Sequence, residues 1–100
     1  MTSRRLLDPV SRVLLDAADY IEKHGHCKGM SRRRDGAVCV AGSISVVIWS
    51  AELRLSARRR LSAYIGIPPY LNIPVWNDAP ARTADEVISA LRGAALMDVP

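Results

Sequence analysis

Hydrophobic residues recur at helical spacing near the start of the chain. The apolar positions within residues 10–21 fall on one face of a helix, and the acidic residues of this segment lie on the others. Asp8 can accept the free N–H groups of a first turn, Pro9 suits the first helical position, and Gly25 can adopt the left-handed conformation that ends a helix. The pattern predicts a helix over residues 9–24.

The uncharged run at residues 37–51 allows two interpretations. Its β-branched residues favour a strand, whereas its length and nearly continuous apolar character are also typical of a buried helix. We expect a helix over about 39–51. Small residues around Gly42 would let a neighbouring helix approach closely, and Trp49 would lie at the end of the face that meets the core.

A proline-rich segment follows a third predicted helix. Ser56 can cap a helix over about 57–65, which Gly66 and the prolines after it would end. Four prolines between residues 66 and 80 favour an extended backbone, so we expect an ordered strap over residues 66–80, laid across the core. Its expected anchors are the apolar side chains Ile67, Tyr70, Leu71, Ile73, Val75 and Trp76.

The last helix has a distinctive start. Thr83 and Glu86 have the spacing of a capping box, in which the side chain of each residue accepts the backbone N–H of the other. Asp85 and Glu86 also suit the positive end of the helix dipole. We expect a helix from the Thr83 cap to about Leu96.

Just before this helix, the triplet Trp76, Asn77 and Asp78 lies between two prolines. We interpret the triplet as structural, with the ring of Trp76 buried against the last helix and Asp78 accepting N–H groups of a turn. No His or Cys nucleophile lies near it in the sequence, so no catalytic role follows. The predicted structural motif therefore comprises Trp76, Asn77, Asp78, Thr83 and Glu86, and no catalytic residue is predicted.

The segment between the first two predicted helices carries paired glycines, an arginine run and an Asp-Gly dipeptide, which are typical of a loop or hairpin. We expect a short β-hairpin near residues 27–39, with Cys27 opposite Cys39. With His24 and His26, the two cysteines supply the ligand types that zinc prefers, but their spacing fits no familiar zinc pattern. We therefore favour two buried, reduced thiols, without a metal site or a cofactor.

The net charge of +4 is concentrated in the middle of the chain. Residues 23–60 hold nine basic residues against two acidic ones, whereas the segments on either side are slightly acidic. Three consecutive arginines on a helix fan over roughly 200°, so they form no flat basic stripe. Nucleic-acid binding through residues 23–60 is therefore the alternative rather than the preferred function. The candidate binding residues are the two arginine triplets, Arg32, Arg33, Arg34, Arg58, Arg59 and Arg60.

Three segments together resemble a known family: LLDAADYIEKHGHCKG, DGAVCVAGSI and PVWNDAPARTADEVISALRGAA. They are similar to small proteins of unknown function from actinobacteria and their phages, which carry a PVWNDxPxRTxxEVI-type C-terminal motif. The resemblance covers about residues 14–95, and family members often carry an aromatic residue where this chain has His26. It implies an actinobacterial or actinophage origin and a cytoplasmic location, and it assigns no catalytic residue.

These patterns predict one mainly α domain over residues 1–100, with about four helices, a short hairpin and a proline-rich strap. No uncharged run reaches the roughly 20 residues that a membrane-spanning helix needs. Asp8 and Pro9 interrupt the N-terminal segment before a long apolar run, unlike a secretory signal. We expect a non-enzymatic, intracellular protein-binding module, acting on a host protein if a phage encodes it, with its oligomeric state open.

Overall fold

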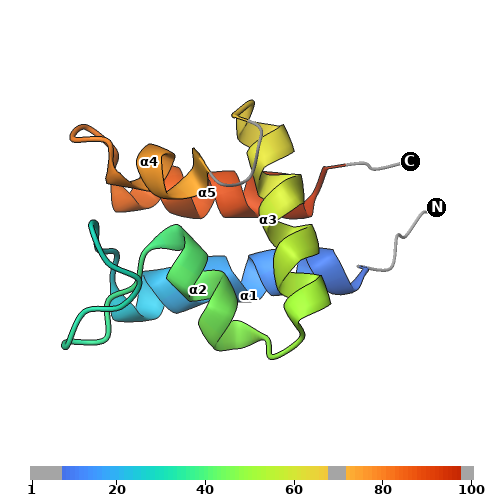
Figure 1. The fold of residues 1–100 in the computed structure, drawn as a ribbon, viewed down its shortest axis with the longest axis horizontal. Coiled ribbons are helices and arrows are strands. Elements are labelled where there is room, and N and C mark those ends of the chain that lie inside the picture. The colour runs from blue at the N-terminus through green and yellow to red at the C-terminus, as the bar shows by residue number, and fades with distance from the viewer. Residues whose placement is uncertain (1–7, 68–71, 98–100) are drawn as a thin grey trace.

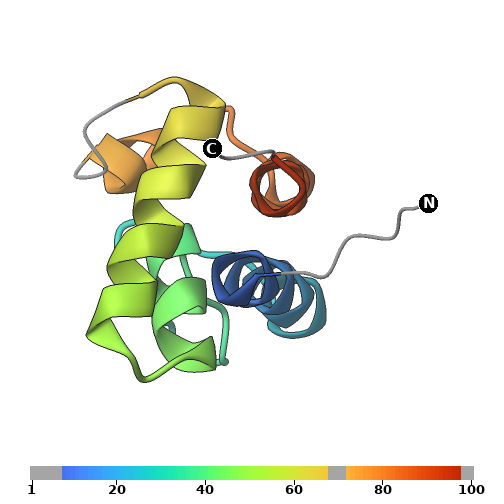
Figure 2. The same cartoon turned by 90° about the vertical axis from the view of Figure 1, so that its right-hand side faces the viewer.

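The computed structural model describes residues 8–67 and 72–97. Five helices lie in these ranges: α1 (Pro9–His24), α2 (Val40–Val47), α3 (Ala51–Ile65), α4 (Ile73–Asp78) and α5 (Ala84–Ala95). Helices α1 and α5 lie side by side and run in opposite directions (Figure 1). Seen nearly along these two helices, α2, α3 and α4 all lie on one side of the pair (Figure 2). The fold is mainly helical, as the sequence predicts.

The caps predicted for the first and last helices are present. The Asp8 side chain accepts the Ser11 N–H at 2.7 Å, and Gly25 ends α1 with a φ of 100°. At the start of α5, Thr83 Oγ1 accepts the Glu86 N–H at 3.1 Å and Glu86 accepts the Thr83 N–H at 2.9 Å. Both ends form locally, because each cap joins residues three positions apart.

Aliphatic side chains from all five helices build one hydrophobic core. Helices α1 and α5 supply much of it through apolar faces at helical spacing. The largest fully buried apolar side chains are Leu14, Ile21, Val38, Val40, Ile44, Leu61, Ile73, Val87 and Leu91. None of the helices in the described residues is both long enough and apolar enough to cross a membrane.

The predicted helix over 39–51 is too long. Helix α2 ends at Val47 because Ile48 adopts an extended conformation, with a φ of −148° and a ψ of 137°. Ser50 then caps α3 by accepting the Leu53 N–H at 3.1 Å, so Ser56 is not the cap and α3 starts well before residue 57. The expectation that Trp49 faces the core is also wrong, because it lies on the connection between α2 and α3 and is exposed.

The predicted hairpin near residues 27–39 does not form. Val38 makes two isolated bridges instead, a parallel one with His26 and an antiparallel one with Arg32, and the described residues contain no β-sheet. This loop, rather than a helix, packs against Gly42, where a Cβ atom would collide with the Ser31 carbonyl oxygen. The small residue therefore allows a close approach, as expected, but of a different segment.

An extended strap is wrong for residues 73–78, which form α4. Pro74 lies in the first turn of this helix, where a missing N–H costs no internal hydrogen bond. Of the predicted anchors, Ile73 is fully buried, Ile67 and Trp76 are half-buried, and Val75 is 73% exposed. Tyr70 and Leu71 lie outside the described residues.

Candidate functional site

Asn77 is a fully buried polar residue near the end of α4 that joins three segments of the chain. Its Oδ1 accepts the Val40 N–H at 3.0 Å and lies 2.7 Å from His26 Nε2, while its Nδ2 donates to the Cys27 carbonyl oxygen at 3.1 Å. Since Asn77 Oδ1 can only accept, the proton shared between Oδ1 and His26 belongs to His26 Nε2. Asn77 therefore ties α4 to the start of α2 and to the loop after α1. The sequence placed it in the structural motif without giving it a role.

Asp78 extends this connection at the surface. Its Oδ1 accepts the Gly29 N–H at 3.0 Å, which is the kind of contact with a turn that we expected. Hydrogen bonds from the Asn77 side chain and from Gly29 hold the pKa of the Asp78 carboxyl below its ordinary value. Lys28 Nζ adds a bond of 2.8 Å to the Ala79 carbonyl oxygen, so the loop is fastened to the end of α4 at several points.

Trp76 is half-buried against the core rather than fully enclosed. The Arg82 guanidinium lies 4.1 Å from the centre of its ring, and Arg82 Nε donates to the Trp76 carbonyl oxygen at 3.0 Å. A cation placed over an indole ring is a stabilising contact. The contacts of Trp76 are thus mostly internal, although its ring also lines an open groove with Tyr64 and Ser89.

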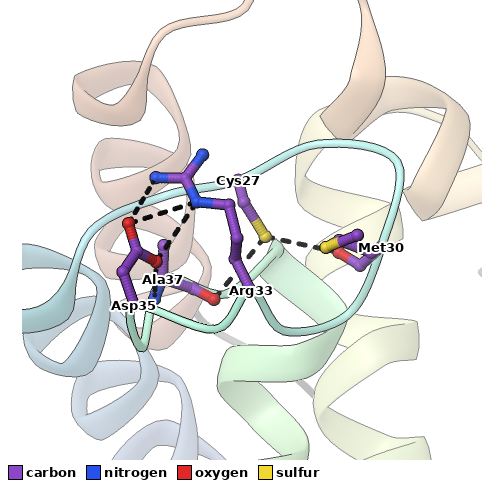
Figure 3. Close-up of polar contacts among 5 residues, drawn as sticks. All are labelled: Cys27, Met30, Arg33, Asp35 and Ala37. Atoms are coloured by element: carbon purple, nitrogen blue, oxygen red, sulfur yellow. Dashed lines mark hydrogen bonds and ion pairs between the residues drawn. The ribbon is translucent and has the colours of Figure 1, made fainter.

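Cys27 belongs to the loop drawn in Figure 3, which also carries the ion pair of Arg33 and Asp35. Its thiol is buried and donates to the Met30 and Ala37 carbonyl oxygens at 3.4 and 3.6 Å. Burial raises the pKa of this thiol, which disfavours the nucleophilic thiolate. In the same loop, Arg33 Nη2 lies 2.9 Å from Asp35 Oδ2, and this bond lowers the pKa of the Asp35 carboxyl.

The other suggested zinc ligands have separate contacts. Cys39 Sγ accepts the Gly42 N–H at 3.2 Å and so caps α2, while the His24 ring lies 4.2 Å from the ring of Tyr20. Within residues 8–67 and 72–97, no group of three or more His, Cys, Asp or Glu side chains is placed to hold a metal ion.

The second arginine triplet is largely engaged within the fold. Arg60 pairs with Asp8 at 3.1 Å and its side chain is 10% exposed, while Arg58 donates to Ser45 Oγ at 3.0 Å. The Arg60 bond, together with the bond from the Ser11 N–H, lowers the pKa of Asp8 from 3.8 to about 2. Of the six candidate arginines, Arg32 alone lines a cavity beside the connection between α2 and α3.

A cavity of about 390 Å³ lies beside the connection between α2 and α3. Trp49 projects from this connection with 91% of its surface exposed, and the neighbouring Val46 is 38% exposed. We call this surface the Trp49 corner, and its lining residues are Tyr20, Arg32, Ser45, Val46, Ile48, Trp49 and Arg54.

The backbone of the Trp49 corner is held in place by Arg54. Its Nε donates to the Ile48 carbonyl oxygen at 2.7 Å and its Nη2 donates to the Ser45 carbonyl oxygen at 2.9 Å. These bonds satisfy carbonyl groups at the end of α2 that have no partner inside the helix. The chain thus presents an indole to solvent on a firmly bonded turn.

The sequence interpretation missed this corner because it continued the apolar run through Trp49. Ser50 is followed by good helix-forming residues, with Glu52 in the first turn of α3. An N-cap residue followed by an acidic first turn is a helix start in its own right. Giving this feature more weight than the apolar run would have placed Trp49 between two helices.

The described residues form a small, mainly helical fold. Asn77 and Asp78 join α4 to α2 and to the loop after α1, and the Trp49 corner exposes a tryptophan. The sequence matches a family of unknown function, DUF6197, over residues 6–96, and the chain belongs to that family. No curated protein and no solved structure matches the chain.

Proposed function

We propose that this chain is a non-enzymatic, intracellular protein-binding module whose contact surface is the Trp49 corner. The observation that carries the proposal is the 91% exposure of Trp49. An indole left in water is costly for a folded chain, and tryptophan and arginine are the residues most enriched at the energetic centres of protein interfaces. A partner that covers Trp49 would recover the apolar burial that the fold leaves unused.

The state of the reactive groups supports binding rather than catalysis. The Cys27 thiol is buried with a raised pKa, and His26 is hydrogen-bonded to Asn77. Neither group faces the cavity at the Trp49 corner. The residues that do line it supply an apolar surface and cations, which suit recognition of a partner.

The resemblance to actinobacterial and actinophage proteins supports the choice of partner. In this proposal the chain is a phage-encoded protein that acts on a protein of its actinobacterial host in the cytoplasm.

Nucleic-acid binding through residues 23–60 is the second candidate. Single-stranded bases stack on aromatic side chains next to arginines, and Arg32 and Trp49 line the same cavity. Against it, Arg58 and Arg60 are engaged within the fold, which leaves fewer cations for phosphate groups. Protein binding is therefore the preferred function.

Site-specific photo-crosslinking tests the preferred function. The photoreactive amino acid benzoylphenylalanine replaces Trp49 in one variant and, as a matched control, Val75 in another, because Val75 is a 73% exposed apolar residue on α4. We expect a discrete protein adduct from an actinobacterial lysate with the position 49 variant and not with the position 75 variant. Equal labelling at both positions, or no adduct at position 49, would contradict the proposal.

A further inference from the structure

Resting on the proposed function, we propose that the Trp49 corner binds an acidic linear segment of the partner protein. One apolar side chain of that segment occupies the cavity beside Trp49, and a neighbouring carboxylate pairs with Arg32.

The cavity at the Trp49 corner has the size of a small binding site. Its volume of about 390 Å³ is near the lower end of the range for pockets that enclose small ligands. Val46, Ile48 and Trp49 give it apolar surface, while Arg32, Ser45 and Arg54 make the larger part of its lining polar. A space of this size can take one apolar side chain of a peptide against Val46, Ile48 and Trp49, with polar groups left for its neighbours.

The rim of the cavity carries one exposed positive charge. Arg54 is committed to the carbonyl groups of Ser45 and Ile48, whereas Arg32 is exposed and has no side-chain partner among the described contacts. The neighbouring carboxylate of Asp35 is already paired with Arg33. Arg32 is therefore the cation that a partner carboxylate can reach, and the excess of basic residues over 23–60 favours the approach of an acidic segment.

The charge of the chain disfavours other occupants of the Trp49 corner. A second copy of this chain would bring two molecules of net charge +4 together and, in a symmetric dimer, would set Arg32 near its own equivalent. A nucleic-acid strand needs several free cations along its path, but Arg58 and Arg60 are engaged within the fold. An acidic peptide satisfies both the apolar side chains of the Trp49 corner and the exposed cation Arg32.

A peptide array measured by fluorescence polarisation tests this assignment with the full chain. Each labelled peptide carries glutamates around one variable apolar residue, and the matched controls carry lysine for glutamate or serine for the apolar residue. A short oligothymidylate serves as the nucleic-acid probe. We expect the best acidic peptide to bind at least about tenfold more tightly than either of its own controls.

Four variants locate the binding surface. Trp49→Ala should weaken the best peptide by about 30-fold, and Arg32→Ala by about fivefold with a reduced salt dependence. Arg12→Ala removes the same charge from an exposed position of α1, and Val75→Ala removes an exposed apolar side chain from α4, so both should bind like the parent chain.

The remaining outcomes overturn the inference in distinct ways. Tighter binding of the lysine peptides, or of oligothymidylate with a steep loss on adding salt, would exclude an acidic peptide. Unchanged binding in Trp49→Ala would place the site elsewhere. If no peptide binds but position 49 still crosslinks to a protein, the acidic segment is wrong and the proposed function stands. If crosslinking at position 49 also fails, both are wrong.

Discussion

Replacing Asn77 by alanine tests the polar connection that organises the fold. The substitution removes the acceptor for the Val40 N–H and the donor for the Cys27 carbonyl group, at bonds of 3.0 and 3.1 Å. Asn77 is fully buried and both backbone groups belong to buried residues, so water cannot readily replace the lost partners. The start of α2 and the loop after α1 should both lose their attachment to α4.

The expected loss follows from these two bonds. Leaving a buried donor or acceptor unsatisfied costs about 1 to 3 kcal/mol, so two such groups give about 2 to 6 kcal/mol. The total stability of a small domain is about 5 to 15 kcal/mol, and Asn77→Ala should therefore remove a large share of it. His26, which is half-buried, can turn towards water and adds little.

Urea unfolding followed by circular dichroism measures this loss, with Asn72→Ala as the matched control. Asn72 is exposed and its side chain makes no capping bond to α4, so its variant should unfold within about 0.5 kcal/mol of the parent chain. Amide exchange adds a local readout, because the Val40 N–H should lose protection when Asn77 is absent. If the two alanine variants unfold alike, the structural role of Asn77 is wrong.

Three further perturbations test other parts of the fold. Gly42→Ala should destabilise by about 2 kcal/mol or more in thermal unfolding, because its Cβ meets the backbone of Ser31; an unchanged midpoint would refute this close approach. Asp8→Asn keeps a capping acceptor but removes the charge facing Arg60. Because the folded pKa of Asp8 is depressed to about 2, its stabilisation is present above pH 3.8 and lost as the pH falls towards 2, so the parent and variant midpoints should converge there. The effect is small, since the Asp8 side chain is 45% exposed, and parallel curves would refute it. Thr83→Ala should cost about 1 kcal/mol through the lost cap of α5, and an equal midpoint would contradict that cap.

The parts of the fold that could be predicted from the sequence depend on short-range contacts. The caps at Asp8 and Thr83 join residues three positions apart, and the buried faces of α1 and α5 follow directly from apolar spacing. For the same reason the predominance of helix was predictable. These features are determined by residues close together in the sequence and do not depend on contacts with distant segments.

The parts that could not be predicted depend on distant segments. Asn77 contacts Val40 and Cys27, which lie 37 and 50 positions away in the sequence. The prolines of residues 66–80 suggested extended backbone, yet Pro74 fits the first turn of a helix equally well, and burial of Ile73 against the core favours that alternative. Local preference allowed both conformations, and tertiary packing selected one.

The candidate site was the least predictable feature. An apolar run that includes a tryptophan is usually a core segment, and here the run is interrupted by the extended residue Ile48. The arginine triplets drew attention to charge by number alone, whereas the structure distinguishes Arg32, which is exposed, from Arg60, which pairs with Asp8. Exposure and pairing of this kind are properties of the folded chain.

The two tryptophans provide the most direct test of the proposed binding surface. Unfolding midpoint and capture of the crosslinked partner are measured together for Trp49→Ala and Trp76→Ala. Because Trp49 is 91% exposed and Trp76 is half-buried, the first variant should unfold within about 0.5 kcal/mol of the parent, and the second should lose about 2 kcal/mol. We predict that Trp49→Ala no longer captures the partner, while Trp76→Ala still captures it below its own midpoint. Capture of the same partner by Trp49→Ala at the parent's level would contradict the proposed function.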